Sequence, residues 1–140
     1  MTNPGIRKAV MRRRSGQGLV EFVVVAPILL LLLFGIIEFA LAWNIRHVVT
    51  DAAREGARNL VIYKDTLAAG QMIRDILTNS HLDPNVATIS TGQNSGGATG
   101  QPATVDVTYP YELRTIRALL GWAGQTGQLN IRTTFVMRNE

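Results

Sequence analysis

The chain of 140 residues contains no cysteine. A disulfide framework, a thiolate nucleophile and any metal site with cysteine ligands are therefore excluded. Histidine is also scarce, and with only His47 and His81 available we predict no metal site.

Sequence motifs typical of enzymes are also missing. None of the serines lies in a nucleophile-elbow motif. The glycine-rich stretch GQNSGGATG lacks the lysine and the following helix of a phosphate-binding loop. We therefore expect a protein that is not an enzyme, has no catalytic residues and needs no cofactor.

The chain has more basic than acidic residues, and a cluster of basic residues near the N-terminus accounts for this excess. The chain has 14 Lys and Arg against 10 Asp and Glu, a formal net charge of +4. No basic stripe interleaved with aromatic residues follows later, so we predict no nucleic-acid binding. The N-terminal basic residues instead indicate membrane topology; they are Arg7, Lys8, Arg12, Arg13 and Arg14.

An apolar run follows these basic residues. Residues 22 to 37 contain no charge, and the wider stretch of residues 19 to 43 contains only Glu21 and Glu38. As a helix the uncharged part is about 24 Å long, and with its flanks it can cross a hydrocarbon core of about 30 Å. The basic residues before the run predict a cytoplasmic N-terminus. Trp43 lies just after the run, where aromatic residues are favoured at the membrane surface.

Three interpretations of this run remain open. A secretory signal would be cleaved at the A-x-A pattern of Ala40 and Ala42, although the run is long for a signal and Glu38 lies beside that site. A plain membrane anchor explains the charges and the run but not Glu21. A prepilin-type leader, cleaved on the cytoplasmic side before the run, explains the largest number of residues.

The third interpretation assigns a role to Glu21. Cleavage between Gly16 and Gln17 leaves Glu21 as the fifth mature residue, followed by Phe22. This order resembles type IV pilins and pseudopilins. In a low-dielectric helix bundle, the new α-amino group and the carboxylate are each costly alone, and pairing between subunits offsets part of that cost and sets the axial register. Gly18 offers a second position for the cut, which suits this pairing less well.

A longer segment resembles a narrower family. The stretch GLVEFVVVAPILLLLLFGIIEFALAWNIRHVVTDAAREGARNLV is similar to the TadE family, the pilin-like proteins of Tad (Flp) pili. The resemblance implies a minor pilin or pseudopilin that helps to assemble an adhesive pilus. It implies a prepilin peptidase, other pilins and pseudopilins of the Tad system and an inner-membrane assembly platform as partners. It also implies a single-pass protein of the bacterial inner membrane with an extracytoplasmic C-terminal domain, which can enter a cell-surface pilus.

Past Trp43 the pattern predicts that the helix continues as an amphipathic stalk. Its small residues have the spacing that allows helices to approach closely. This helix-packing stripe consists of Ala52, Ala53, Gly56 and Ala57. It could pack on the protein's own domain or on neighbouring subunits. We favour the own domain from Leu60 onward and leave residues 45 to 57 open.

The remaining sequence predicts a small head. A second helix is expected at residues 65 to 77, and strands are expected at 86 to 91, at 103 to 109 with Pro110 ending the strand, and from 128. Residues 92 to 102 are a predicted loop and residues 112 to 122 a predicted short helix. The fold class is thus α+β: a long N-terminal transmembrane helix continuing as a stalk, with a head of helices and a short antiparallel sheet. The predicted division is leader 1–16, transmembrane helix 17–43, stalk 44–63 and head 64–140.

Overall fold

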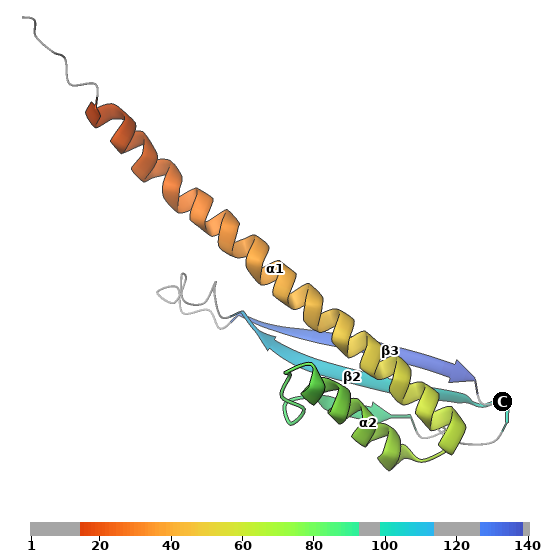
Figure 1. Cartoon of the computed structure of the whole chain (residues 1–140). Coiled ribbons are helices and arrows are strands. Elements are labelled where there is room, and N and C mark those ends of the chain that lie inside the picture. The colour runs from red at the N-terminus through yellow and green to blue at the C-terminus, as the bar shows by residue number, and fades with distance from the viewer. Residues whose placement is uncertain (1–14, 93–98, 114–126, 139–140) are drawn as a thin grey trace, which may run out of the picture. The chain divides into compact units, whose positions relative to one another are not determined.

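The computed structural model of the chain describes residues 15–92, 99–113 and 127–138. Within these residues the elements in chain order are α1 (Ser15–Tyr63), α2 (Thr66–Asn79), β1 (Thr88–Thr91), β2 (Pro102–Glu112) and β3 (Gln128–Arg138) (Figure 1). The predicted α+β class, with a long apolar N-terminal helix, a second helix and a small antiparallel sheet, is confirmed.

Helix α1 continues unbroken from one packing unit into another. Residues up to Leu33 form the first unit, and residues from Phe34 form the second unit together with the other elements. In the first unit the helix is apolar all round, whereas from Val49 onward its buried residues recur at three- and four-residue spacing. The predicted continuation of the helix past Trp43 is confirmed. The predicted boundaries of leader, membrane segment and stalk stay predictions, because packing marks neither a cleavage site nor a membrane surface.

Local interactions separate α1 from α2. Lys64, directly after α1, has a left-handed backbone with φ of 53°, and its N–H donates to the Leu60 carbonyl at 2.9 Å. Asp65 then caps α2, since its Oδ1 accepts from the backbone N–H of Leu67 at 2.8 Å and of Ala68 at 3.2 Å. These N–H groups have no partner within the helix, so the cap stabilises its start. The predicted second helix is confirmed.

The sheet has β2 at its centre, with β1 and β3 antiparallel to it on either side. The three predicted strands are confirmed, but the prediction that Pro110 ends the second one is wrong. β2 continues to Glu112, and Pro110 pairs with Asn130 of β3. Pairing with β1 stops at Thr108, so among the described strands only β3 neighbours β2 at Pro110. A missing backbone N–H is tolerated at such a local edge.

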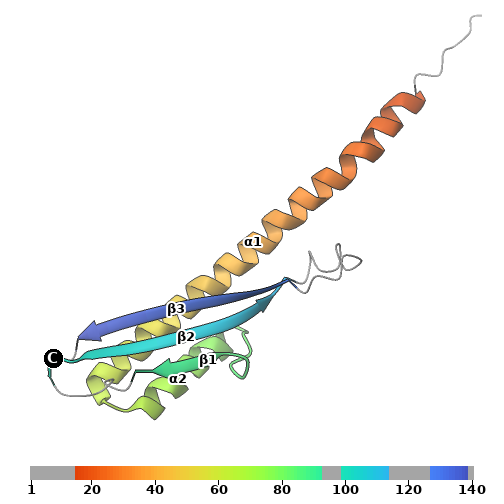
Figure 2. The ribbon, with the colours of Figure 1, turned by 180° about the vertical axis from the view of Figure 1, so that it is seen from behind.

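The core of the second unit lies between the helices and one face of the sheet. The part of α1 in this unit and α2 both cover the same face, as the two opposite views show (Figures 1 and 2). Strand β2 alternates buried and half-buried residues, as a strand with one covered face does. The largest fully buried side chains of this core are Leu60, Ile73, Leu77, Val49, Val105 and Val107.

Two predicted segments lie wholly or partly outside the described residues. Of the short helix expected at 112 to 122, only the first two residues are described, and Glu112 belongs to β2. Of the loop expected at 92 to 102, residues 93 to 98 are outside the description, and Pro102 begins β2.

Candidate functional site

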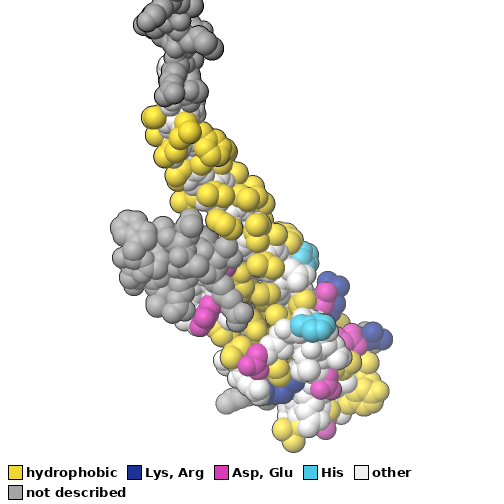
Figure 3. Space-filling view, turned by 60° about the vertical axis from the view of Figure 1, so that its left-hand side comes forward, with side chains coloured by type: hydrophobic (Ala, Val, Ile, Leu, Met, Phe, Trp, Pro, Cys, Tyr) yellow, Lys and Arg dark blue, Asp and Glu magenta, His cyan; other side chains and the backbone are white. Residues whose placement is uncertain are grey.

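The N-terminal part of α1 exposes an apolar surface. Its large hydrophobic side chains range from 42% exposed at Ile37 to 67% at Phe22, and Phe34 is the half-buried exception. Hydrophobic side chains dominate this part of the helix in the view of Figure 3. Among the described residues, α1 is the one helix long and apolar enough to cross a membrane by length and composition. A surface of this size is unfavourable in water and suited to lipid or to other apolar helices.

Glu21 lies within this apolar surface. Its side chain is exposed, and no hydrogen bond or ion pair joins it to another described residue. Gly16 and Gln17 lie beside it along the helix, together with apolar residues that line the same shallow depression. Phe22 is exposed next to it. The structure therefore brings the four residues of the predicted processing and register sites into two turns of helix. Their roles stay predictions.

Glu38, the second carboxylate of the apolar stretch, is in the opposite situation. It is 2% exposed, and the Tyr111 hydroxyl donates to its Oε1 at 2.7 Å. A buried carboxylate needs such donors, because desolvation of the charge is otherwise costly. This contact joins α1 to the end of β2. Burial therefore distinguishes Glu38, held inside the chain, from Glu21, which is open to a partner.

The contact between Glu38 and Tyr111 was not predicted from the sequence. In the sequence, Glu38 stands out as one of the two charges of the apolar stretch and for its place beside the A-x-A pattern. Tyr111 lies beyond Pro110, where the strand is expected to end. The available signal was the carboxylate itself, because a charge within an apolar helix requires a partner somewhere in the protein or its assembly.

The small-residue stripe packs inside the chain's own core. Ala52, Ala53 and Ala57 are 0% exposed and Gly56 is buried. A Cβ added at Gly56 would lie 2.5 Å from Cδ1 of Ile73 on α2. At Gly56 the two helices therefore approach closely, and all four residues are covered by the chain's own domain. This packing leaves no accessible surface at these four residues for a neighbouring subunit.

An aromatic and basic cluster follows the apolar surface on α1. The rings of Phe39 and Trp43 stack with centroids 5.8 Å apart, and His47 meets Trp43 edge-on at 5.4 Å. The Arg46 guanidinium lies 5.8 Å from the centroid of the Trp43 ring. Phe39 and Trp43 remain exposed by 67% and 49%, so the cluster is open to the surroundings of the helix.

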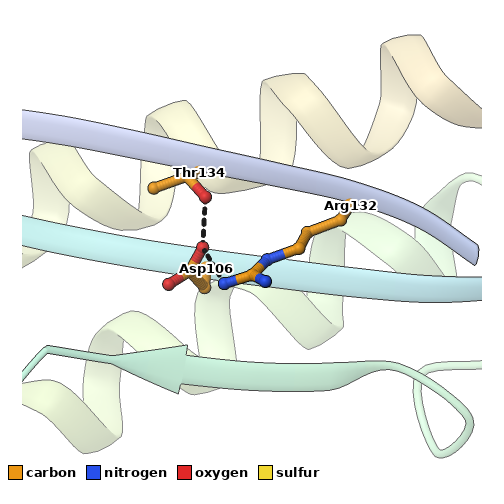
Figure 4. Close-up of polar contacts among 3 residues, drawn as sticks. All are labelled: Asp106, Arg132 and Thr134. Carbon is orange, nitrogen blue, oxygen red and sulfur yellow. Dashed lines mark hydrogen bonds and ion pairs between the residues drawn. The ribbon is translucent and has the colours of Figure 1, made fainter.

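Polar side chains on the sheet form a separate surface contact. Asp106 of β2 accepts a hydrogen bond from the Thr134 hydroxyl of β3 and pairs with Arg132, whose Nη2 lies 3.4 Å from Oδ1 (Figure 4). Asp106 and Thr134 are directly opposite in the strand register. Such cross-strand pairs stabilise a sheet. No group of three or more His, Cys, Asp or Glu side chains that could hold a metal ion occurs within the described ranges.

These features define a class: a protein with one helix suited to a membrane and a small α+β head in which the same helix supplies part of the core. Residues 16–58 match the model of a particular family, described as TadE-like protein. The resemblance to the TadE-like family is therefore confirmed over this segment. The match includes every predicted processing, register and helix-packing residue, and Glu38 as well. No match was found among curated proteins or among solved structures.

Proposed function

We propose that the chain is a TadE-like minor pilin or pseudopilin that takes part in assembling a Tad/Flp-type pilus used for adhesion. The family match associates it with the Tad pilus system. In our proposal α1 anchors the chain in the bacterial inner membrane, with the N-terminus cytoplasmic and the head outside. The chain then acts by helix–helix assembly, without catalysis and without a cofactor, and can enter the pilus itself.

The observation that supports this function best is the environment of Glu21. An exposed carboxylate with no partner among the described residues, on a helix that is apolar all round, is costly in lipid unless a cation neutralises it. Cleavage between Gly16 and Gln17 would create such a cation, the α-amino group, on each neighbouring chain. We propose that this pair forms between subunits and fixes their axial register.

Burial inside the chain limits where subunits can meet. Glu38 is bound by Tyr111, and Ala52, Ala53 and Gly56 face the chain's own core. Contacts between subunits cannot use these residues without disrupting the chain's own packing, whereas the N-terminal part of α1 exposes its large apolar side chains. This assigns assembly to the apolar half of α1 and folding to the other half.

The competing functions fit the structure less well. Signal peptidase cleavage after Ala42 would remove Glu38 from its contact with Tyr111 and cut a helix that continues into the core at Val49. An uncleaved anchor carrying a binding module is compatible with the fold but leaves Glu21 without a role. The partners expected in our proposal are a prepilin peptidase, the inner-membrane assembly platform and other pilins and pseudopilins of the Tad system.

The position of the mature N-terminus tests the proposal. Intact mass and N-terminal sequencing of the protein from membranes of its native cells are expected to show a chain that starts at Gln17. A start at Leu19, from a cut after Gly18, would retain processing but change the register of Glu21. A start at Trp43 would establish a secreted domain, and an uncleaved chain would establish the anchor.

A further inference from the structure

A groove lies between α1 and the edge of β3, directly after the apolar surface. It has a volume of about 380 Å³. Its lining comes from the aromatic cluster of α1 and from one end of β3. The lining residues are Phe39, Ala42, Trp43, Arg46, Leu129, Asn130, Ile131 and Arg132. All of them belong to the second packing unit.

The groove combines an apolar interior with one available positive charge. Phe39 and Trp43 form one wall, and Leu129, itself 48% exposed, contributes to the other. Arg132 also lines the groove, but its guanidinium is paired with Asp106. Arg46 has no acidic partner within the described part of the chain, and it lies over the Trp43 ring. None of the described residues that line the groove carries a carboxylate, so the groove complements an anion attached to an apolar chain.

The position along α1 indicates where that ligand comes from. Residues 16 to 37 span about 32 Å as a helix, close to the thickness of a hydrocarbon core, about 30 Å. If α1 spans a membrane, as in our proposed function, Phe39 to Arg46 lie at the level of the lipid headgroups. Aromatic and basic side chains are favoured at this level. The molecules around the groove that combine an anionic group with apolar chains are then the lipids of the membrane.

We propose that the groove binds one anionic phospholipid of the surrounding membrane, such as phosphatidylglycerol. Arg46 contacts the phosphate, and the glycerol end of an acyl chain packs between the ring of Phe39 and Leu129. A volume of about 380 Å³ lies at the small end of the range for ligand pockets, so it accommodates this part of a lipid rather than a helix of another protein. The bound lipid covers apolar surface of the head where it leaves the membrane.

Fluorescence of Trp43 can test the lipid preference in the full chain. The sequence contains two tryptophans, so Trp122→Phe leaves Trp43 as the single reporter. The protein is placed in vesicles containing phosphatidylcholine or phosphatidylglycerol with acyl chains brominated near the glycerol end. We expect brominated phosphatidylglycerol to quench Trp43 at about fivefold lower mole fraction, the factor that one cationic side chain near anionic lipid contributes.

Two arginine variants separate the groove from general electrostatics. Arg46→Gln is expected to abolish the preference, whereas Arg54→Gln is expected to retain it. Arg54 is a matched control because its guanidinium also lies over a ring of its own chain, 5.5 Å from the centroid of Phe135, and it lines no part of the groove. An equal loss of the preference for phosphatidylglycerol in both variants would overturn the lipid site. Equal quenching by the two lipids would do the same. Neither result would affect the proposed function.

Flotation of the same vesicles distinguishes this inference from the proposed function. Protein that floats while neither lipid quenches Trp43 would show that lipid does not occupy the groove, which overturns the lipid site and leaves the membrane anchoring in place. Protein that neither floats nor is quenched would show that α1 is not in the membrane, which overturns the membrane anchoring and the lipid site together.

Discussion

Gly56→Ala places one methyl group into the contact between α1 and α2. The added Cβ would lie 2.5 Å from Cδ1 and 2.6 Å from Cγ1 of Ile73, whose side chain is fully buried, so the Ile73 side chain or the helix would have to shift within the core. Overpacking of a filled core costs about 1–3 kcal/mol. Replacing a helical glycine by alanine gains about 0.5–1 kcal/mol. The steric cost is the larger effect, so we expect a loss of about 1 kcal/mol in the free energy of unfolding of the head.

Gly70→Ala is the matched control, because Gly70 is on α2 and a Cβ added there meets nothing within 4 Å. Only the gain in helix propensity remains, so this variant is expected to be about 0.5–1 kcal/mol more stable. Pulse proteolysis of the full chain in detergent across a urea series measures both changes. Equal stabilisation by the two substitutions would refute the close packing of α1 on α2.

A second substitution tests the cause of the loss. Ile73→Val removes the Cδ1 atom nearest to the added methyl and alone costs about 0.5–1.5 kcal/mol. Together with Gly56→Ala it is expected to cost less than the sum of the two single changes, because the deleted atom makes room for the added one. A double-mutant cycle gives this coupling directly. Strict additivity would place the origin of the loss outside the contact between Gly56 and Ile73.

Two further contacts, the proposed register residue and the processing site are addressed by single variants. Tyr111→Phe removes the 2.7 Å hydrogen bond to Glu38 and is expected to lower the stability of the head by about 1.5–3 kcal/mol in the same proteolysis assay, since the acceptor is a carboxylate; an unchanged midpoint would show that this bond contributes nothing. Asp65→Ala removes the cap of α2 and is expected to cost about 1 kcal/mol, whereas Asp65→Asn is expected to retain most of it. Glu21→Gln is expected to leave membrane insertion intact and to reduce pilus assembly in native cells; pili at the normal level, in a system that requires this protein, would contradict the register role. Gly16→Leu is expected to block maturation, seen as an unprocessed chain by mass, and a mature form with the same N-terminus would show that the cut lies elsewhere.

Periodicity predicted the elements of this fold because it reports on local burial. Spacing of three and four residues located α2, and alternation located β2 and β3. The extension of β2 past Pro110 was not predictable in this way. It depends on β1 ending its pairing at Thr108, a property of a neighbouring strand that the local sequence does not contain.

The candidate site was predictable in its residue types and less so in its geometry. The small stripe could have served a neighbouring subunit or the chain's own core, because both uses require the same spacing. Ile73, on a different helix, decides between them by its distance from Gly56. The partner of Glu38 is likewise separated from it by 73 positions and lies beyond a proline. Pairings over such distances depend on the topology of the sheet and not on local pattern.

The two glutamates of the apolar stretch differ in burial, and this difference decides which of them is open to the subunit contact that we propose. Both have the same side chain on the same helix, and the family match includes both. Glu38 is enclosed and bound by Tyr111, so a neighbouring subunit could reach it only by disrupting the head. Glu21 is exposed on an apolar helix and has no partner within the described ranges. A charge contact between subunits in the membrane is therefore expected at Glu21, and a substitution at Glu38 is expected to reduce assembly only to the extent that it unfolds the head.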